Sequence, residues 1–435
     1  MSYVIIGNSV AAAGCIEGIR LRDKTAPITV LSAEKRPIYA RPLISYLLQG
    51  KTDEARMSYR PADFYARNKC ALRAGVTATR IDAAKKQVAL ADGERVPYGK
   101  LLVATGSRPF VPPADGLEKI KYFTFMTLDS AKALEAVLSP DTRVLIVGAG
   151  LIGMKCAEGI AERSGSVAVV EMQPRVLPTV LDAEGAAIIQ KQMEAHKVRF
   201  YLGDSVKTYA AKASAADGME AAKTVCTENS AGAAFGGSAL LASGKTVEFD
   251  VLIMAVGVRP NTQLVADAGG KVERGIVVDE HCRTSIPDVY AAGDCTESDD
   301  ISFGGRRILA LLPNAYMQGE AAGISMSGGE KPFITAFPLN AAGFFGLHLV
   351  SAGSYAGEIL DIPAAGALYR KFFVKDDLLK GFIIIGEAAR AGIYTALIRD
   401  KTPLSSIDFD LIKAAPALMA FSKARREEIL AGRTA

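Results

Sequence analysis

The chain has 435 residues, of which 49% are hydrophobic, and a net charge of +4 from 51 basic and 47 acidic residues. This length predicts two or three domains, and the apolar content excludes a wholly disordered chain. The small, mixed charge gives no argument for a nucleic-acid partner. Without a signal peptide or an apolar run of ~18 residues, we expect no membrane insertion.

The first predicted elements are strands 3–7 and 27–32 with a helix between them, which form a βαβ unit. Gly7, Ser9 and Ala12 stand at the places of a G-x-G-x-x-G turn, where small residues let a pyrophosphate approach the helix N-terminus. Because the match is degenerate, dinucleotide binding and a plain packing turn both stay open at this point.

A second unit carries the full pattern. Strand 143–147 is followed by Gly148, Gly150 and Gly153, and the next strand ends at Glu171. A carboxylate there accepts hydrogen bonds from both ribose hydroxyls and repels a 2′-phosphate. The sequence therefore predicts a dinucleotide site that favours NAD(H) over NADP(H).

Three later strands end in turns that are rich in small residues. Residues 101–112 and 251–261 are matching apolar strands with a Gly-x-Arg-Pro exit, which is typical of connections between domains. Residues 284–294 end at Asp294, which we expect to hydrogen-bond a ribityl hydroxyl. Residues 208–246 are rich in Ala, Gly and Ser and predict surface strands and loops.

Five motifs in this order resemble those of the FAD/NAD(P)-dependent pyridine nucleotide-disulfide oxidoreductases. They are Gly7-x-Ser9-x-x-Ala12, Ala104-Thr105-Gly106, Gly148-x-Gly150-x-x-Gly153 with Glu171, Gly257-x-Arg259-Pro260-Asn261, and Ala291-Ala292-Gly293-Asp294. The resemblance implies an α/β fold with two Rossmann-like domains and a C-terminal α+β interface domain. It places an FAD-binding domain at 1–112 and 257–328, an inserted NAD(H)-binding domain at 113–256, and the interface domain at 329–435.

The resemblance also implies the cofactors FAD and NAD(H), without a metal. The residues expected at FAD are Gly7, Ser9, Ala12, Glu34, Arg41, Pro42, Thr105, Gly106, Asp294, Asn314 and Ala315. Those expected at NAD(H) are Gly148, Gly150, Gly153, Glu171 and Gly257. By the same resemblance, the helix in 311–328 begins facing the flavin, where its N-terminal dipole stabilises negative charge.

The chain departs from the family where a redox thiol is expected. Relatives carry Cys-x4-Cys on the first helix after the opening unit, or one cysteine within the segment 36–50, but here Tyr39-Ala40-Arg41-Pro42 occupies that place. We expect Pro42 in the first turn of a helix and Arg41 beside the flavin or its phosphates; the alternative for Arg41 is a solvent-facing loop anchor. Cys15 and Cys156 are interpreted as helix-packing thiols, and Cys295 as the one thiol near the flavin.

A second departure is Lys155, where many relatives have a glutamate near the nicotinamide. The lysine inverts the local charge, and pairing with Glu158 one turn along is an open alternative to a catalytic role. Arg41 and Lys155 are thus the two catalytic candidates.

Without a thiol, electrons must leave the flavin directly, as in the NADH-dependent rubredoxin and ferredoxin reductases and in flavoprotein subunits such as that of phenylglyoxylate dehydrogenase, which the C-terminal part resembles. The resemblance implies a cytoplasmic NADH:acceptor oxidoreductase with an iron–sulfur protein or partner subunit, as an oligomer or in a complex. The alternatives are an NADH oxidase or CoA-disulfide/persulfide reductase, and a redox-sensing or structural flavoprotein subunit.

Overall fold

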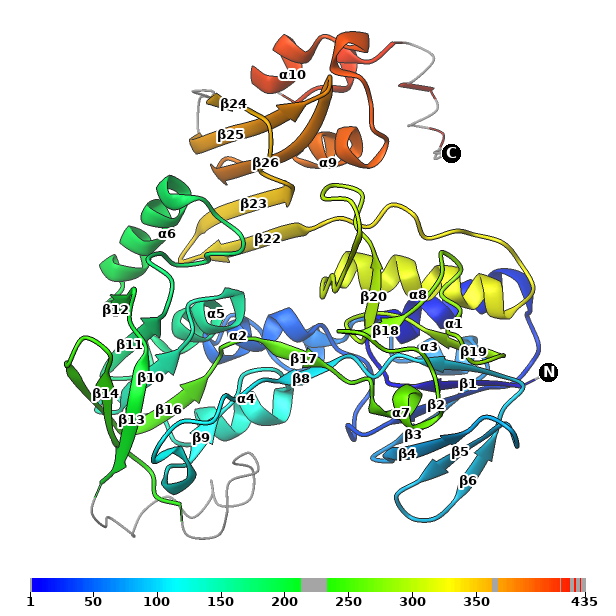
Figure 1. Cartoon of the computed structure of the whole chain (residues 1–435), viewed down its shortest axis with the longest axis horizontal. Coiled ribbons are helices and arrows are strands. Elements are labelled where there is room, and N and C mark those ends of the chain that lie inside the picture. The colour runs from blue at the N-terminus through cyan, green and yellow to red at the C-terminus, as the bar shows by residue number, and fades with distance from the viewer. Residues whose placement is uncertain are drawn as a thin grey trace.

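The computed structural model describes residues 2–212, 233–361, 367–414, 416–422, 426–427 and 431. Three bodies are visible in Figure 1: two lobes side by side, each around a parallel sheet, and a C-terminal body above them. The fold is therefore α/β with an appended antiparallel sheet, as the sequence predicted.

The first lobe is built on a five-stranded parallel sheet with the order β19-β7-β1-β2-β3. Its strands are β1 (Tyr3–Ile6), β2 (Ile28–Ser32), β3 (Cys70–Ala74), β7 (Lys100–Val103) and β19 (Val289–Ala291). Strands β1 and β2 flank helix α1 (Val10–Arg22), which confirms the predicted βαβ unit. Because β19 pairs with β7 from far along the chain, two separate segments complete this sheet.

Helix α1 packs against α8 (Leu312–Met326) at backbone distance. A Cβ on Gly319 would lie 2.0 Å from the carbonyl oxygen of Ala11, and a Cβ on Gly14 would lie 2.3 Å from that of Tyr316. Only glycine allows two helices to approach this closely, so the crossing fixes how the start of α8 sits against the start of α1.

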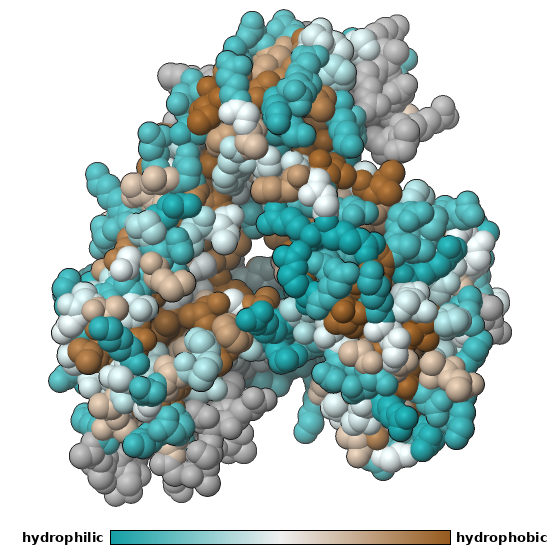
Figure 2. Space-filling model, in the orientation of Figure 1, coloured by the Kyte–Doolittle hydropathy of each residue, from teal (hydrophilic) through white to brown (hydrophobic). Residues whose placement is uncertain are grey.

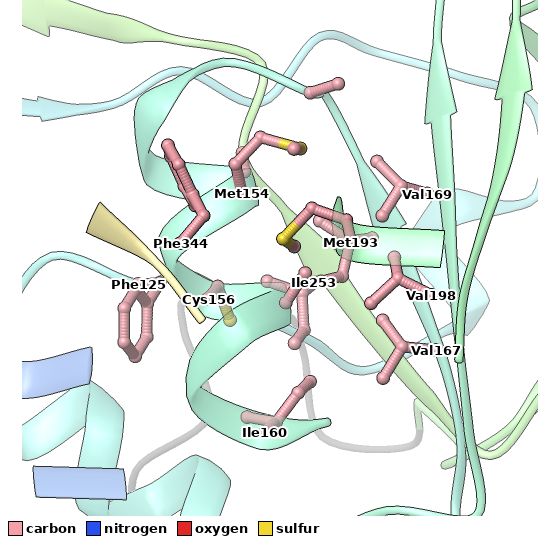
Figure 3. Packing of buried hydrophobic residues seen from close by; sticks show 14 of the residues in the cluster. Phe125, Met154, Cys156, Ile160, Val167, Val169, Met193, Val198, Ile253 and Phe344 are labelled. Carbon is pink, nitrogen blue, oxygen red and sulfur yellow. The ribbon is translucent and has the colours of Figure 1, made fainter. Parts of the chain in front are cut away.

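The second lobe is built on a parallel sheet with the order β12-β11-β10-β16-β9. Its strands are β9 (Tyr122–Phe123), β10 (Arg143–Val147), β11 (Ser166–Glu171), β12 (Val198–Leu202) and β16 (Val251–Met254). Helices α5 (Leu151–Ile160) and α6 (Ala183–Ala195) pack on one face through a core that Figure 3 shows in part. The other face packs against an antiparallel sheet of β13 (Val206–Ala211), β14 (Gly237–Leu241) and β15 (Thr246–Phe249).

These three strands agree with the surface strands expected in 208–246, whereas residues 213–232 lie outside the described part of the chain. A two-stranded antiparallel ribbon of β8 (Ser107–Pro109) and β17 (Val258–Pro260) connects the two lobes (Figure 1). It corresponds to the two Gly-x-Arg-Pro exits.

The C-terminal body holds an antiparallel sheet with the order β22-β23-β26-β25-β24. Its strands are β22 (Leu339–Phe344), β23 (Leu347–Gly353), β24 (Glu358–Asp361), β25 (Ala367–Lys375) and β26 (Leu378–Gly386), followed by α9 (Gly392–Arg399) and α10 (Phe409–Ala414). The turn between β22 and β23 reaches α5, where Figure 3 shows Phe344 beside Met154. The C-terminal sheet and the second lobe therefore share one apolar core.

Shorter elements complete the described part of the chain. They are α2 (Ile44–Leu48), α3 (Phe64–Arg67), α4 (Leu128–Glu135), α7 (Gln263–Asp267), β4 (Ala78–Asp82), β5 (Gln87–Leu90), β6 (Arg95–Pro97), β18 (Ile276–Val277), β20 (Thr296–Asp299) and β21 (Arg306–Arg307). Among the helices of the described residues, none combines the length and apolar character that a membrane crossing requires.

Candidate functional site

The first glycine turn has the geometry of a phosphate cradle. Gly7 adopts φ +108°, and a Cβ there would lie 2.1 Å from the carbonyl oxygen of Ala104, so no other residue fits this turn. Ser9 caps α1 with extended backbone and makes no side-chain hydrogen bond to the helix. The first-turn N–H groups of α1 are thus left for an anion, and Ala12 lies fully buried behind them.

A cavity of about 320 Å³ lies at the carboxyl ends of β1 and β2 and continues this cradle. Its lining includes Gly7 and Thr105, two residues that the sequence analysis assigned to FAD. Gly106 follows with φ +64°, and its carbonyl oxygen accepts a 2.9 Å hydrogen bond from the N–H of Asn261. The cavity and the cradle fit the adenosine and pyrophosphate parts of a dinucleotide.

Several residues of this cavity have no role predicted from the sequence. They are Ile6, Leu31, Ala33, Val76, Thr77, Ala78, Arg108, Asn261, Gln263 and Leu264. Residues 76–78 follow the third strand of the sheet, and their short apolar or hydroxyl side chains carry no motif. The available signal was topological: in an open parallel sheet, ligands bind beyond the carboxyl ends of the strands.

Glu34 and Arg41 meet each other. The carboxylate of Glu34 accepts hydrogen bonds from the Arg41 guanidinium and, at 2.8 Å, from the Tyr39 hydroxyl. Arg41 also donates to the carbonyl oxygen of Met126 at 3.0 Å. Pro42 lies in a 3₁₀ turn, Arg41–Leu43, that leads into α2, so the predicted helix start at Pro42 is confirmed. This pair holds the segment that stands in place of the redox thiol.

Asp294 lies just past the end of β19, beside Ser107, whose hydroxyl donates to it at 3.4 Å. Burial raises the pKa of this carboxyl, while the Ser107 hydroxyl and the charge of Arg41 act in the opposite direction. A further hydroxyl donor, such as a ribityl chain would supply, would therefore stabilise the ionised form of this carboxylate.

Helix α8 begins next to this carboxylate. Asn314 and Ala315 lie buried in its first turns, and the Asn314 amide donates to the carbonyl oxygen of Phe337 at 3.1 Å. Further along, Gln318 accepts a 2.8 Å hydrogen bond from the N–H of Gly293. The helix is thereby tied to the turn that presents Asp294.

The second glycine turn repeats the first in the other lobe. Gly148 has φ +107°, and a Cβ there would lie 2.4 Å from the carbonyl oxygen of Ala255. A Cβ on Gly153 would lie 2.0 Å from the carbonyl oxygen of Gly148, whereas Gly150 caps α5 with open space around it. Gly257 is also open, with φ +115°. Each glycine thus has the steric role that the fingerprint assigns to it.

Glu171 lies at the end of β11, as a ribose-binding carboxylate must. Its two oxygens accept 2.8 Å hydrogen bonds from the N–H groups of Ala149 and Gln173, and each keeps a further lone pair. Arg175 faces its own loop and donates to the carbonyl oxygens of Leu181 (3.2 Å) and Pro178 (3.1 Å). Its guanidinium thus binds backbone carbonyl oxygens of its own loop, which disfavours a contact with the 2′-phosphate of NADP(H).

Lys155 takes part in an ion pair between α5 and the C-terminal sheet. Its Nζ contacts the carboxylate of Glu158, which is only 3% exposed, and donates to the carbonyl oxygen of Gly343 at 2.9 Å. The other oxygen of Glu158 accepts from the N–H of Phe345 at 2.7 Å. Lys155 also lies 4.6 Å from the centre of the Tyr46 ring. The pairing alternative raised by the sequence is therefore what the structure shows.

The thiols of the described residues are withdrawn into the core. Cys15, Cys156, Cys282 and Cys295 are buried, Cys70 is half-buried, and Cys226 lies outside the described residues. Burial raises the pKa of each of the five, that of Cys295 to about 11. Each thiol therefore stays protonated at neutral pH, which disfavours nucleophilic chemistry. No group of three or more metal-ligating side chains occurs in the described ranges.

Comparison with known proteins agrees with this geometry. A family model described as pyridine nucleotide-disulphide oxidoreductase matches residues 1–319. The chain is 31% identical, over 93% of both chains, to the NADH-dependent phenylglyoxylate dehydrogenase subunit epsilon of Aromatoleum evansii. It is 28% identical to the rubredoxin-NAD(+) reductase of Pseudomonas putida, over 76% of this chain and 81% of that one.

Among solved structures, putidaredoxin reductase in its covalent complex with putidaredoxin superposes with a TM-score of 0.81 at 23% identity, covering 99% of this chain and 98% of that chain. At this identity the likeness shows the fold. Members of the matched family are NAD(P)H-dependent oxidoreductases that use FAD. Because the family model matches residues 1–319 and a relative is 31% identical over 93% of both chains, this chain belongs to the pyridine nucleotide-disulphide oxidoreductase family.

Proposed function

We propose that this chain passes electrons from NADH, through FAD, to an iron–sulfur protein or a partner subunit of a larger redox complex. The observation that carries the proposal is the segment Tyr39–Pro42, where an Arg41–Glu34 pair stands in place of a redox thiol. Four of the five cysteines of the described residues are buried and Cys70 is half-buried, which disfavours a disulfide relay there.

The residues divide into two holding sites. The Gly7 turn, Asp294 and the start of α8 would hold FAD, and the Gly148 turn with Glu171 would hold NADH. Bound FAD supplies the conversion of two-electron hydride donation into one-electron transfer. The protein contributes alignment, through the close α1–α8 crossing and the shared core of the second lobe and the C-terminal sheet.

The preference for NADH over NADPH follows from the residues expected at the adenosine ribose of the cofactor. The Glu171 carboxylate would repel a 2′-phosphate, and Arg175, the nearest basic residue along the chain, is bound to backbone carbonyl oxygens. We also propose the domain limits 1–112 with 257–328 for FAD, 113–256 for NADH, and 329–435 for the C-terminal domain. The β8–β17 ribbon, at the first and second of these limits, supports them.

The names of the relatives support the same acceptor class. The relative with 93% mutual coverage is a subunit of an NADH-dependent dehydrogenase, and another is a reductase of rubredoxin. Both names describe redox proteins that act with a nicotinamide, and the second names rubredoxin as its redox partner. An acceptor of this kind needs access to the flavin and no nucleophile, which agrees with the site.

A thiol titration combined with an acceptor comparison tests the proposal. FAD-loaded protein is reduced with NADH without oxygen, its accessible thiols are counted before and after, and turnover is compared for ferricyanide, oxygen and a disulfide or persulfide. We expect an unchanged thiol count and the fastest turnover with the one-electron acceptor. New thiols on reduction, or faster turnover of oxygen or a persulfide, would contradict the proposal and favour the oxidase or reductase alternative.

A further inference from the structure

The connection between the lobes borders a second cavity, whose lining shares Arg108 with the cavity assigned to FAD. It measures about 730 Å³, within the range of small-molecule sites, and residues of both lobes line it. Leu117, Glu118 and Tyr122 contribute from the second lobe, and Arg274 from the first. Figure 2 shows the deep notch that separates the lobes, and the β8–β17 ribbon crosses it.

Two arginines of the ribbon face the cavity together. Arg108 of β8 and Arg259 of β17 are directly opposite each other in the antiparallel register, so their side chains stand on the same face. Their neighbour Ser107 points to the other face, where it contacts Asp294. The two guanidiniums are thus directed away from the FAD carboxylate, and as like charges on opposed positions they destabilise the ribbon.

Neither charge is neutralised by a carboxylate among the described residues. Arg108 donates to the amide oxygen of Asn261 at 3.1 Å, a neutral acceptor. The Arg259 guanidinium lies over the Phe110 ring, 4.3 Å from its centre. Within the described part of the chain, its N–H groups donate to no hydrogen-bond acceptor.

The other charged groups of the cavity do not cancel this pair. Arg274 is already neutralised by Glu297, to which it donates at 2.9 and 3.1 Å. Glu118 is exposed and has no ion pair with an arginine of the cavity in the described residues. Even with the Glu118 carboxylate included, the arginines give the lining an excess of positive charge. Phe110 and prolines form an apolar wall beside these charges.

We propose that this cavity binds an organic phosphate of nucleoside diphosphate size, separately from NADH. Two adjacent guanidiniums match the paired oxygens of a diphosphate, and the apolar wall accepts the attached organic group. Because residues of both lobes line the cavity, its occupant contacts both sides of the connection. Binding therefore relieves the Arg108–Arg259 repulsion and stiffens the ribbon.

Titration calorimetry on the FAD-loaded protein at saturating NAD⁺ tests this inference. The phosphate probes are ADP and inorganic pyrophosphate, and adenosine is the probe without phosphate. Saturating NAD⁺ keeps both phosphate probes out of the NADH site. We expect ADP and pyrophosphate to bind, adenosine not to bind, and Arg259→Ala to weaken binding roughly tenfold through the loss of a charge-assisted contact. Arg259→Lys should recover part of the affinity.

The matched control is Arg199→Ala, an exposed arginine at the start of β12 outside the cavity, which should bind both probes as the wild type does. The flavin absorbance of each variant shows that FAD is retained. The inference is overturned if neither phosphate probe binds, if Arg259→Ala binds as the wild type does, or if NAD⁺ displaces the probes, since they would then occupy the NADH site.

Discussion

Replacing Lys155 with methionine should loosen the turn between β22 and β23 and slow the reduction of FAD by NADH. The substitution keeps the length of the side chain and removes its contacts with Glu158, the carbonyl oxygen of Gly343 and the Tyr46 ring. Glu158, 3% exposed, would keep one hydrogen bond, from the N–H of Phe345. Its charge would then be buried without a counter-ion.

Removing one partner of a buried ion pair costs about 3 kcal/mol. That cost falls on the contact between α5 and the β22–β23 turn, because Lys155 and Glu158 both bond to backbone atoms there. Since 1.4 kcal/mol corresponds to a factor of ten in an equilibrium constant, hydrogen exchange at the Phe345 amide should become roughly a hundredfold faster. FAD content should not change, because none of these atoms lies at the FAD cradle.

Hydrogen–deuterium exchange and stopped-flow reduction by NADH measure the two effects. The control is Lys191→Met, an exposed lysine on α6, which should change neither. Adding Glu158→Gln to Lys155→Met should recover much of the exchange protection, since no buried charge remains while the amide oxygen still accepts from Phe345. If Lys155→Met leaves both the exchange and the reduction rate at wild-type values, the pair has no positioning role.

Three further outcomes follow from the same structure. Gly319→Ala places a methyl group 2.0 Å from a backbone oxygen of α1, so the protein should lose FAD on gel filtration, whereas Gly392→Ala, with nothing within 4 Å, should keep it. Glu171→Gln should raise KM for NADH roughly tenfold at unchanged kcat with ferricyanide, and NADPH should stay a poor donor because Arg175 is engaged; efficient NADPH use would refute this. Asp294→Asn should weaken FAD retention yet raise the thermal midpoint of the FAD-free protein at neutral pH. Since burial raises the pKa of the native carboxyl, the gain should vanish as the pH falls through that pKa, and a gain that persists at low pH would contradict the assignment.

The sequence predicted those features whose residues are close together in the chain. Gly148, Gly150, Gly153 and Glu171 span one βαβ unit. Steric need fixes Gly148 and Gly153, whereas Gly150 has open space around it. The degenerate turn at Gly7 left two interpretations open. The contact with Ala104 that requires a glycine there depends on a strand that the local sequence does not include.

Long-range contacts could not be predicted in the same way. The acceptor for Lys155 is Gly343, 188 residues away, and no local pattern shows that a hairpin turn will lie over α5. Likewise the two Gly-x-Arg-Pro exits contain Arg108 and Arg259, but only the register of β8 and β17 shows that these residues lie opposite each other. The spacing of residues in the sequence predicts the binding motif of one βαβ unit. The contacts between separate parts of the fold depend on packing across the whole core.

The missing thiol and the lysine on α5 are parts of one arrangement. The segment that would carry a redox cysteine continues into α2, where Ile44 and Leu48 pack in the same core as Met154 and Ile160 of α5. In that segment Tyr46 lies against Lys155. The segment therefore joins the FAD side to the NADH helix and, through Lys155, to the C-terminal turn. These contacts fix the segment relative to α5 and the C-terminal turn, as the proposed direct transfer from the flavin would require of a protein without a thiol relay.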